Sequence, residues 1–299
     1  MHSNTKTKMK IKVLFNLNNA LGEGPQWDVK NQRIYWIDSF DKKIYRATAE
    51  GKELKHWDLP EIVGSFCLTK TGNAIFAGQS GLFEFNFFNK EFHYIFVPKS
   101  KKKNLRFNDG KVDRNGNFFF GSMDTHENEG IGAVYRCDSN RYVKELATGF
   151  VVFNGPCWSP DGEIFYASDS GAGKIWRYDY CSSKGSIKNK TLIISTKDPL
   201  NGSFDGCTVD DEGCLWSARI FGGRIDRFSP DGKLIQSIKM PIKKPTSVTF
   251  GGPNQDILYV TSMGKNFLPI HPKDKKYRGA LFSISGLGVR GIEERRHNS

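Results

Sequence analysis

The sequence lacks the features that define several classes of protein. No apolar run of about 18 residues occurs in the chain, so no transmembrane helix is expected. Residues 1–10 include lysines but no apolar stretch of signal-peptide length. The six cysteines have no C-x-x-C or paired Cys/His spacing, which argues against a zinc knuckle or a redox dithiol. We therefore expect a soluble, cytoplasmic protein with free, buried thiols and no membrane partner.

Familiar catalytic and cofactor motifs are also scarce. The chain has no G-x-S-x-G sequence, the motif around the nucleophile of α/β-hydrolases. Residues 286–291 (GLGVRG) fit G-x-G-x-x-G, but no helix or βαβ unit is indicated after them, which disfavours a dinucleotide site. No stretch has a sustained apolar period of 3.6 residues. Helix-based folds, Ser/His hydrolases and dinucleotide-dependent enzymes are therefore disfavoured.

The net charge of +12 is scattered along the chain. Lysine and arginine occur in short runs, such as 101–103 and 273–276, mostly beside turn residues. A protein that binds nucleic acid typically gathers its basic residues into one stripe or patch. The scattered runs instead predict solvated loops, and we expect no nucleic-acid partner.

A repeat extends through the sequence. In each copy an apolar residue precedes Asp, Ser, Thr or Gly, then a turn, then a β-rich run with alternating polarity. The apolar residue recurs at intervals of 41 to 51 residues, at Trp27, Leu68, Val112, Trp158, Val209 and Phe250. This interval is the span of a four-stranded propeller blade. The sequence predicts an all-β, six-bladed β-propeller with four-stranded antiparallel blades, as a single domain over residues 1–299.

The two ends of the chain carry separate expectations. Ile11, Val13 and Phe15 alternate with other residues and have no blade of their own. We expect this N-terminal strand to pair with residues 279–284 and so close the last blade. Roughly the first 8 and the last 6 residues are expected to be frayed, as chain ends often are.

Polar residues recur at one offset within the repeat. The residues four positions before the repeated apolar residue are Glu23, Gly64, Asn108, Asn154, Asp205 and Thr246. In a propeller, side chains at one register of the innermost strands lie at one height around the channel. Two carboxylates and two amides are hard ligands suited to Ca²⁺, Mg²⁺ or Mn²⁺. Asn and Asp are also ordinary turn formers, but four at one offset favour a metal site.

Further polar residues stand beside this ring. Arg106 and Asp109 flank Asn108, while Met123 and Asp124 end the next predicted strand. The guanidinium of Arg106 has several donors and suits an anionic or polyhydroxyl ligand. A solvated arginine is the competing interpretation.

Several joints of the repeat resemble the SMP-30/gluconolactonase family, also called regucalcin-like lactonases. The resemblance rests on LGEGPQW (21–27), RFNDGKVD (106–113), NGPCWSPDG (154–162) and FDGCTVDDEGCLW (204–216), and it covers nearly the whole chain in order. It implies a six-bladed propeller with a divalent metal in the channel and hydrolysis of sugar lactones. It also implies that Glu23, Asn154 and Asp205 bind the metal, and that Asp205 doubles as general base. Asn108 is implied as a further ligand or as a substrate contact, together with Arg106.

The chain departs from that family in two places. Phe204 stands where the family usually has proline before Asp-Gly. After Met123, where an acidic substrate contact often follows in the family, the chain reads DTHENE (124–129). We take Met123 and Glu127 as candidate substrate contacts, with Glu129, or neither acidic residue, as the alternatives.

The sequence thus predicts a metal-dependent carboxylic-ester hydrolase that opens an aldonolactone to its aldonic acid. The cofactor is one divalent cation, with Ca²⁺, Zn²⁺, Mn²⁺ and Mg²⁺ left open, and the partner is a small-molecule sugar lactone. One competing function is a non-enzymatic propeller that only binds calcium or another ligand, because a fold does not determine a function. A metal-dependent esterase or phosphotriesterase is the other. The sugar, the metal and the oligomeric state are not readable from these patterns.

Overall fold

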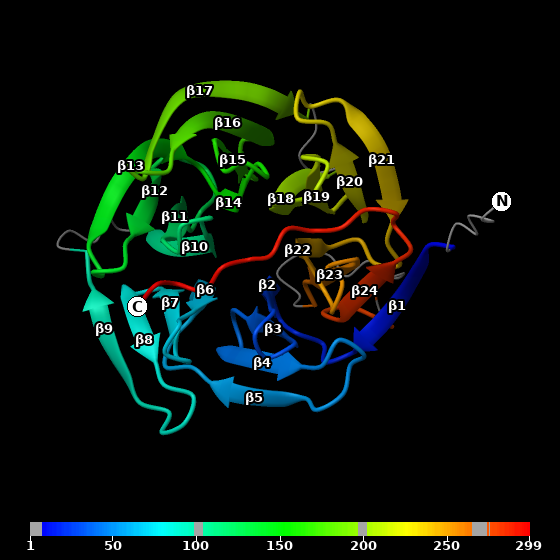
Figure 1. Ribbon diagram of the computed structural model, residues 1–299, viewed down its shortest axis with the longest axis horizontal. Coiled ribbons are helices and arrows are strands. Elements are labelled where there is room, and N and C mark those ends of the chain that lie inside the picture. The colour runs from blue at the N-terminus through cyan, green and yellow to red at the C-terminus, as the bar shows by residue number, and fades with distance from the viewer. Residues whose placement is uncertain (1–7, 99–103, 197–201, 265–273, 275) are drawn as a thin grey trace.

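The computed structural model describes residues 8–98, 104–196, 202–264, 274 and 276–299. Over this part of the chain it contains 24 β-strands and no α-helix. The strands form six four-stranded antiparallel sheets arranged as blades around a central axis (Figure 1). The predicted six-bladed propeller is therefore confirmed. No helix long and apolar enough to cross a membrane is found in the residues described.

Each of the first five blades runs outward in chain order from the innermost strand. Blade 1 consists of β2 (Gly22–Asp28), β3 (Arg33–Asp38), β4 (Lys43–Ala47) and β5 (Lys55–Asp58). Blade 2 consists of β6 (Val63–Leu68), β7 (Ala74–Gly78), β8 (Leu82–Phe85) and β9 (Phe92–Phe96). Blade 3 consists of β10 (Leu105–Val112), β11 (Phe118–Asp124), β12 (Gly132–Cys137) and β13 (Val143–Phe150). Blade 4 consists of β14 (Phe153–Trp158), β15 (Ile164–Asp169), β16 (Lys174–Cys181) and β17 (Ser186–Ser195). Blade 5 consists of β18 (Ser203–Val209), β19 (Leu215–Ile220), β20 (Arg224–Phe228) and β21 (Leu234–Lys239).

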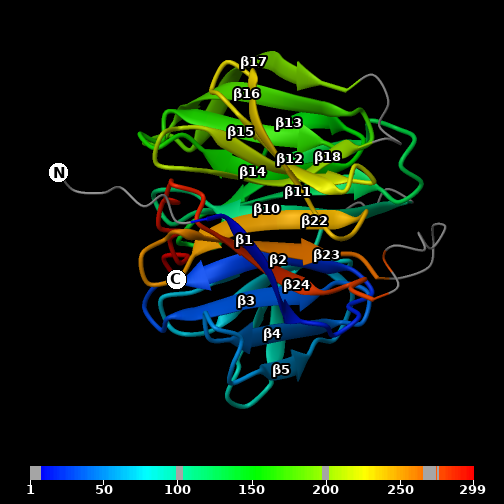
Figure 2. The same cartoon turned by 90° about the vertical axis from the view of Figure 1, so that its right-hand side faces the viewer.

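Blade 6 combines the two ends of the chain. Its inner strands are β22 (Pro245–Gly251), β23 (Ile257–Ser262) and β24 (Leu281–Ser285), and its outermost strand is β1 (Lys10–Phe15). Strand β1 pairs antiparallel with β24, as predicted (Figure 2). The pairing joins the first and last parts of the sequence and covers an edge of β24 that would otherwise be exposed.

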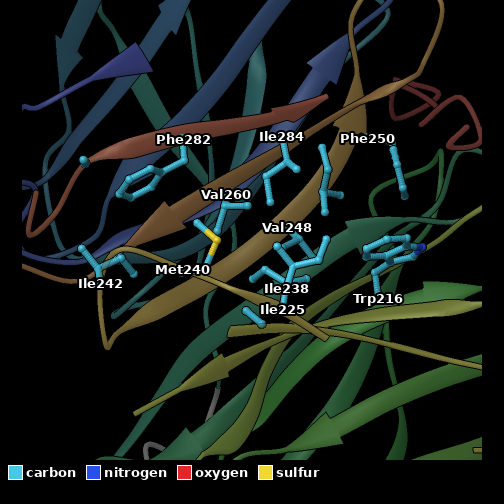
Figure 3. Close-up of a cluster of buried hydrophobic side chains, with 13 residues drawn as sticks. Trp216, Ile225, Ile238, Met240, Ile242, Val248, Phe250, Val260, Phe282 and Ile284 are labelled. Carbon is cyan, nitrogen blue, oxygen red and sulfur yellow. The ribbon is translucent and has the colours of Figure 1, made fainter. Parts of the chain in front are cut away.

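Apolar side chains fill the space between blades. Figure 3 shows the cluster between blades 5 and 6, where Trp216 and Ile225 meet Val248 and Val260. Between blades 6 and 1, the ring of Trp27 stacks on that of Tyr259 with 5.9 Å between centroids. Successive residues of a strand point to opposite faces, and both faces of a blade meet a neighbouring blade, so inner strands such as β7 and β11 are buried along their whole length.

The C-terminal residues are bound to the propeller, so the expectation that they are frayed is wrong. The tail crosses the face of the ring at the end where the innermost strands finish (Figure 1). His297 is fully buried and donates its N–H to Leu68 O at 2.8 Å, and Asn298 donates to Gly116 O at 3.0 Å. Arg296 forms an ion pair with Asp28 at 2.6 Å. The tail is polar because its partners are backbone groups and a carboxylate. The corresponding expectation for the N-terminus concerns residues that are mostly outside those described.

Candidate functional site

The six residues at the shared offset lie in the innermost strands, at or inside a β-bulge. The pairing of each innermost strand with its neighbour is interrupted between Glu23 and Gln26 in blade 1, and at the corresponding place in the other five. A bulge bends the strand and redirects side chains, and bulges are common beside active sites. Each copy of the sequence repeat therefore carries a β-bulge at the same place in its innermost strand.

Asn108 links two blades through its side-chain amide. Its Nδ2 donates to Asn154 Oδ1 at 2.8 Å and to Phe153 O at 2.9 Å, while its Oδ1 accepts from Arg106 at 2.8 Å. Three of the predicted site residues thus form one hydrogen-bonded chain. Asn108 orients both of its neighbours, and each of its side-chain atoms already has a protein partner.

Asn154 is fixed from several sides. Its Nδ2 donates to Ser170 Oγ at 2.7 Å, and the next N–H, that of Gly155, donates to Asp109 Oδ2 at 2.8 Å. Gly155 has a positive φ of 58°, and an added Cβ would lie 2.7 Å from Cys207 Sγ. Both conditions favour glycine, because side chains rarely adopt this backbone conformation. Asp109 is therefore a residue that positions the Asn154 turn.

Two buried carboxylates complete the ring. Glu23 and Asp205 have exposed fractions of 9% and 4%, and Asp205 Oδ1 is buried without a hydrogen-bond partner among the residues described. Burial raises the pKa of Glu23 well above its usual range, and the charges of Asp205 and Asp109 raise it further. Burial also raises the pKa of Asp205, followed by the charges of Asp109 and Glu127. Buried carboxylates that repel each other are the natural surroundings of a cation.

Arg106 is a positive side chain that contacts the ring through Asn108 and acts electrostatically on Glu23. Burial lowers the pKa of Arg106, and the negative charges of Glu127 and Glu23 oppose this effect. In the sheet, Arg106 lies directly opposite Met123, which is 3% exposed. The structure thus places Met123 beside the ring and mostly out of solvent contact.

The loop after Met123 is shaped by one carboxylate. Asp124 accepts hydrogen bonds from three N–H groups of residues 126–129, at 3.0 to 3.1 Å. Glu127 adopts a positive φ of 56° in this loop. Glu127 is an exposed residue, yet desolvation by the surrounding loop raises the pKa of its carboxylate and the charge of Arg106 lowers it, so Glu127 lies within electrostatic reach of the ring. Glu129 contributes its N–H to Asp124.

The two positions of the ring without a ligand-type side chain bring neighbouring blades together. A Cβ added at Gly64 would overlap Cα of Asn108, so only glycine allows β6 to approach β10 this closely. Thr246 is fully buried and its hydroxyl donates to Gly22 O at 2.5 Å, next to Glu23. Both residues position their neighbours in the ring. These roles could not be predicted from the sequence, since they depend on contacts between blades.

Phe204, the departure from the family pattern, is buried beneath a cation. The guanidinium of Arg219 lies 3.8 Å from the centroid of the Phe204 ring, and Arg219 also pairs with Asp226 at 3.7 Å. Ser170 Oγ, which accepts from Asn154, donates to Phe204 O at 2.6 Å. The cation–π contact holds the phenyl ring, and the hydrogen bond from Ser170 holds the backbone directly before Asp205.

The donor set fits a divalent cation. The described residues contain no group of three or more His, Cys, Asp or Glu side chains arranged to hold a metal. Amide oxygens are also ligands for hard cations. Glu23, Asp205 and Asn154 provide two carboxylates and one amide oxygen. The unpartnered Asp205 Oδ1 is a buried atom that lacks the positive partner a cation would supply. Oxygen ligands of this kind suit hard ions.

Comparison with known proteins identifies a family and its relatives. The sequence pattern described as "SMP-30/Gluconolactonase/LRE-like region" matches residues 21–264. A 6-deoxy-6-sulfogluconolactonase of Pseudomonas putida is 30% identical over 284 residues, covering 95% of this chain and 97% of that protein. Human regucalcin is 31% identical over 292 residues, covering 96% and 97% respectively.

Solved structures are similar over the same length. A luciferin-regenerating enzyme superposes with a TM-score of 0.90 at 28% identity, covering 98% of this chain and 100% of that one. The calcium-binding protein regucalcin of Agrobacterium tumefaciens has a TM-score of 0.90 at 24% identity, covering 97% and 98%, and supports the fold. Since the family pattern spans most of the chain, the protein belongs to the SMP-30/gluconolactonase/LRE-like family.

Proposed function

We propose that the protein hydrolyses a sugar lactone to the corresponding acid at the ring formed by Glu23, Asn108, Asn154 and Asp205. The observation that carries the proposal is the buried, unpartnered Asp205 Oδ1 beside a second buried carboxylate and the Arg106–Asn108 pair. Family membership supports it, because one relative is a sulfogluconolactonase.

A divalent cation would be held by Glu23, Asn154 and Asp205. It would supply polarisation of the lactone carbonyl. Asn108 is assigned to positioning, because its Oδ1 accepts from Arg106 and its Nδ2 donates to Asn154. Asn108 is therefore proposed as a positioning residue rather than a direct metal ligand.

Asp205 is the candidate general base. A base takes a proton from the attacking water as the water oxygen bonds to the lactone carbonyl carbon. When the ring C–O bond breaks, the same proton is returned to the leaving alkoxide oxygen, so protons and electrons balance. Asp205 is 4% exposed, and Ser168 Oγ donates to its backbone carbonyl at 2.9 Å, which holds the residue in one place during this exchange.

Arg106, Met123 and Glu127 are the candidate substrate contacts. Arg106 has donors for hydroxyl or anionic groups, and Glu127 has acceptor oxygens for hydroxyls. Met123 offers an apolar surface next to Arg106. Together they would orient the sugar ring so that its carbonyl faces Asp205.

The proposal is tested with a panel of five- and six-membered sugar lactones. Hydrolysis is measured by the acid that is released. The protein is assayed after chelation and after return of Ca²⁺, Zn²⁺, Mn²⁺ or Mg²⁺, and bound metal is measured separately. We expect turnover that is lost on chelation and restored by at least one ion. Glu163→Gln, which changes an exposed carboxylate in the turn between β14 and β15, serves as control and should behave as wild type.

Two alternative outcomes have clear meanings. Stoichiometric calcium binding without turnover of any lactone would favour the binding propeller, in line with regucalcin relatives. Hydrolysis of simple esters or phosphotriesters at rates above those of all lactones would favour the esterase alternative.

A further inference from the structure

A second cavity lies at the other end of the propeller, between the C-terminal tail and the turns of blades 1 to 3. Its volume is about 350 Å³. The turns contribute residues 28–30, Lys70 and 114–116, and the tail contributes residues 293–296 and 298. The candidate functional site lies near the start of the innermost strands, whereas the residues that line this cavity lie at or after the ends of those strands and in the tail. Figure 1 shows the tail crossing this face of the ring.

Positive side chains dominate the lining. Lys30, Lys70, Arg114, Arg295 and Arg296 all border the cavity. Of the acidic residues there, Asp28 is neutralised by Arg296 at 2.6 Å, and Glu294 is neutralised by Lys111 at 2.8 Å. Glu293 is the remaining carboxylate, and its residue is exposed. Four cations therefore face one exposed carboxylate.

Three of these four cations have no side-chain partner among the residues described. Lys30, Lys70 and Arg295 are exposed, and none makes a side-chain hydrogen bond or ion pair within the described part of the chain. Their charges come from three separate segments, the turns of blades 1 and 2 and the tail. Nothing in the local sequence draws them together, so their convergence is a product of the tail crossing the ring.

Arg114 is the partly buried member of the group. One of its terminal nitrogens donates to Trp158 O at 3.0 Å, but its Nε is buried without a partner among the residues described. Burial lowers the pKa of Arg114, and although Glu294 raises it, the positive charge of Arg295 lowers it further. Two guanidinium groups that repel each other at the edge of a cavity are stabilised by an anion between them.

We propose that this cavity binds a phosphate group, either as the free ion or as part of a small phosphorylated molecule, through Lys30, Lys70, Arg114 and Arg295. A multiply charged tetrahedral anion has oxygens for cations on several sides, whereas a single carboxylate serves one or two. The cavity is larger than one phosphate ion, so a phosphorylated small molecule has room. The anion would tie the tail to blades 1, 2 and 3.

Binding is measured by calorimetry with inorganic phosphate, pyrophosphate and a sugar phosphate, at constant ionic strength set with chloride. We expect saturable binding with one site per chain for at least one of these probes. Because a ligand that binds only the folded state stabilises it, the same probe should raise the melting temperature. Free phosphate and the sugar phosphate separate the two sources of the phosphate group.

The variant Lys30→Ala/Lys70→Ala should weaken binding at least tenfold, and Arg295→Ala should also weaken it. The matched control is Lys55→Ala/Lys90→Ala, which removes the same charge from exposed lysines outside the cavity. Both double variants should retain lactone hydrolysis, so failure of the proposed activity and failure of this site are distinguishable. Equal binding by the two double variants, absence of saturable binding, or binding lost only in Arg106→Ala would overturn the proposal.

Discussion

The innermost strands have a site end, where they start and where the candidate functional site lies, and a turn end, where they finish. An aspartate at one end is in a different environment from an aspartate at the other. At the turn end, Asp210 is fully buried and accepts from two backbone N–H groups, from Trp216 and from Arg227. At the other end, Asp205 is also buried, yet its Oδ1 has no partner in the residues described. Asp205 lies within β18, and Asp210 follows directly after that strand.

The difference lies in what satisfies each carboxylate. At the turn end the protein provides every partner, as it also does for Asp113, which accepts from Asn117 and Tyr180. At the site end, hydrogen bonds orient Asn108 and Asn154 but leave the carboxylates repelling each other. Buried polar groups normally have partners, so the carboxylates at the site end are the ones that would accept a cation.

Replacing Asp205 is expected to have the largest effect on activity. Asp205→Ala should lower kcat/KM for the best lactone by about 10² to 10⁴-fold, the range for loss of a general base, and should abolish metal binding. Folding should survive, because the substitution removes an unpaired buried carboxylate. Kinetics, metal content and thermal unfolding check these points. An active or metal-loaded Asp205→Ala would contradict the assignment.

Replacing Asp210 is expected to show the opposite behaviour. Asp210→Ala should lower the free energy of unfolding by about 3 to 5 kcal/mol, because it leaves Arg227 and other donors without their acceptor. The matched control is Glu212→Ala, which removes the 61% exposed partner of the same arginine. The control should cost about 0 to 1 kcal/mol. Denaturant unfolding measures both, and equal losses would show that the burial of Asp210 is not the cause.

The tail provides a third test, at the level of stability. Glu294 pairs with Lys111 at 2.8 Å, with side-chain exposures of 7% and 15%, and also accepts from Thr249 at 2.9 Å. Glu294→Ala leaves a poorly solvated lysine unpaired and should destabilise the protein by about 3 kcal/mol. Glu293→Ala, its exposed neighbour, should have little effect. Similar unfolding curves for both variants would contradict the structural role of the tail.

Asn108 gives the finest test of the site. Asn108→Ala should reduce kcat/KM by about 10 to 100-fold, as expected when a residue that orients metal ligands is lost, with metal still bound. The metal content of the purified variant is the decisive measurement. If Asn108→Ala loses its metal as completely as Asp205→Ala, then Asn108 is a direct ligand.

Much of the fold could be predicted because its causes are local. Alternation along a strand and Gly or Asn in the turns act over a few residues, and six copies make the pattern visible. The pairing of β1 with β24 was also predicted, since Ile11 and Val13 needed an apolar partner. The tail was misjudged, because a charged segment gives no sign that Asp28 and Lys111 lie within its reach.

For the site, the sequence by itself determined which residue types stand at one register of the six repeats. The tertiary structure decided how they act together. The hydrogen bond from Asn108 to Asn154, the close approach of Gly64 to Asn108 and the electrostatic contact of Glu127 with Arg106 each join segments from different strands or loops. Such contacts depend on how blades pack and where bulges bend the strands, and these distances are set by the closed ring.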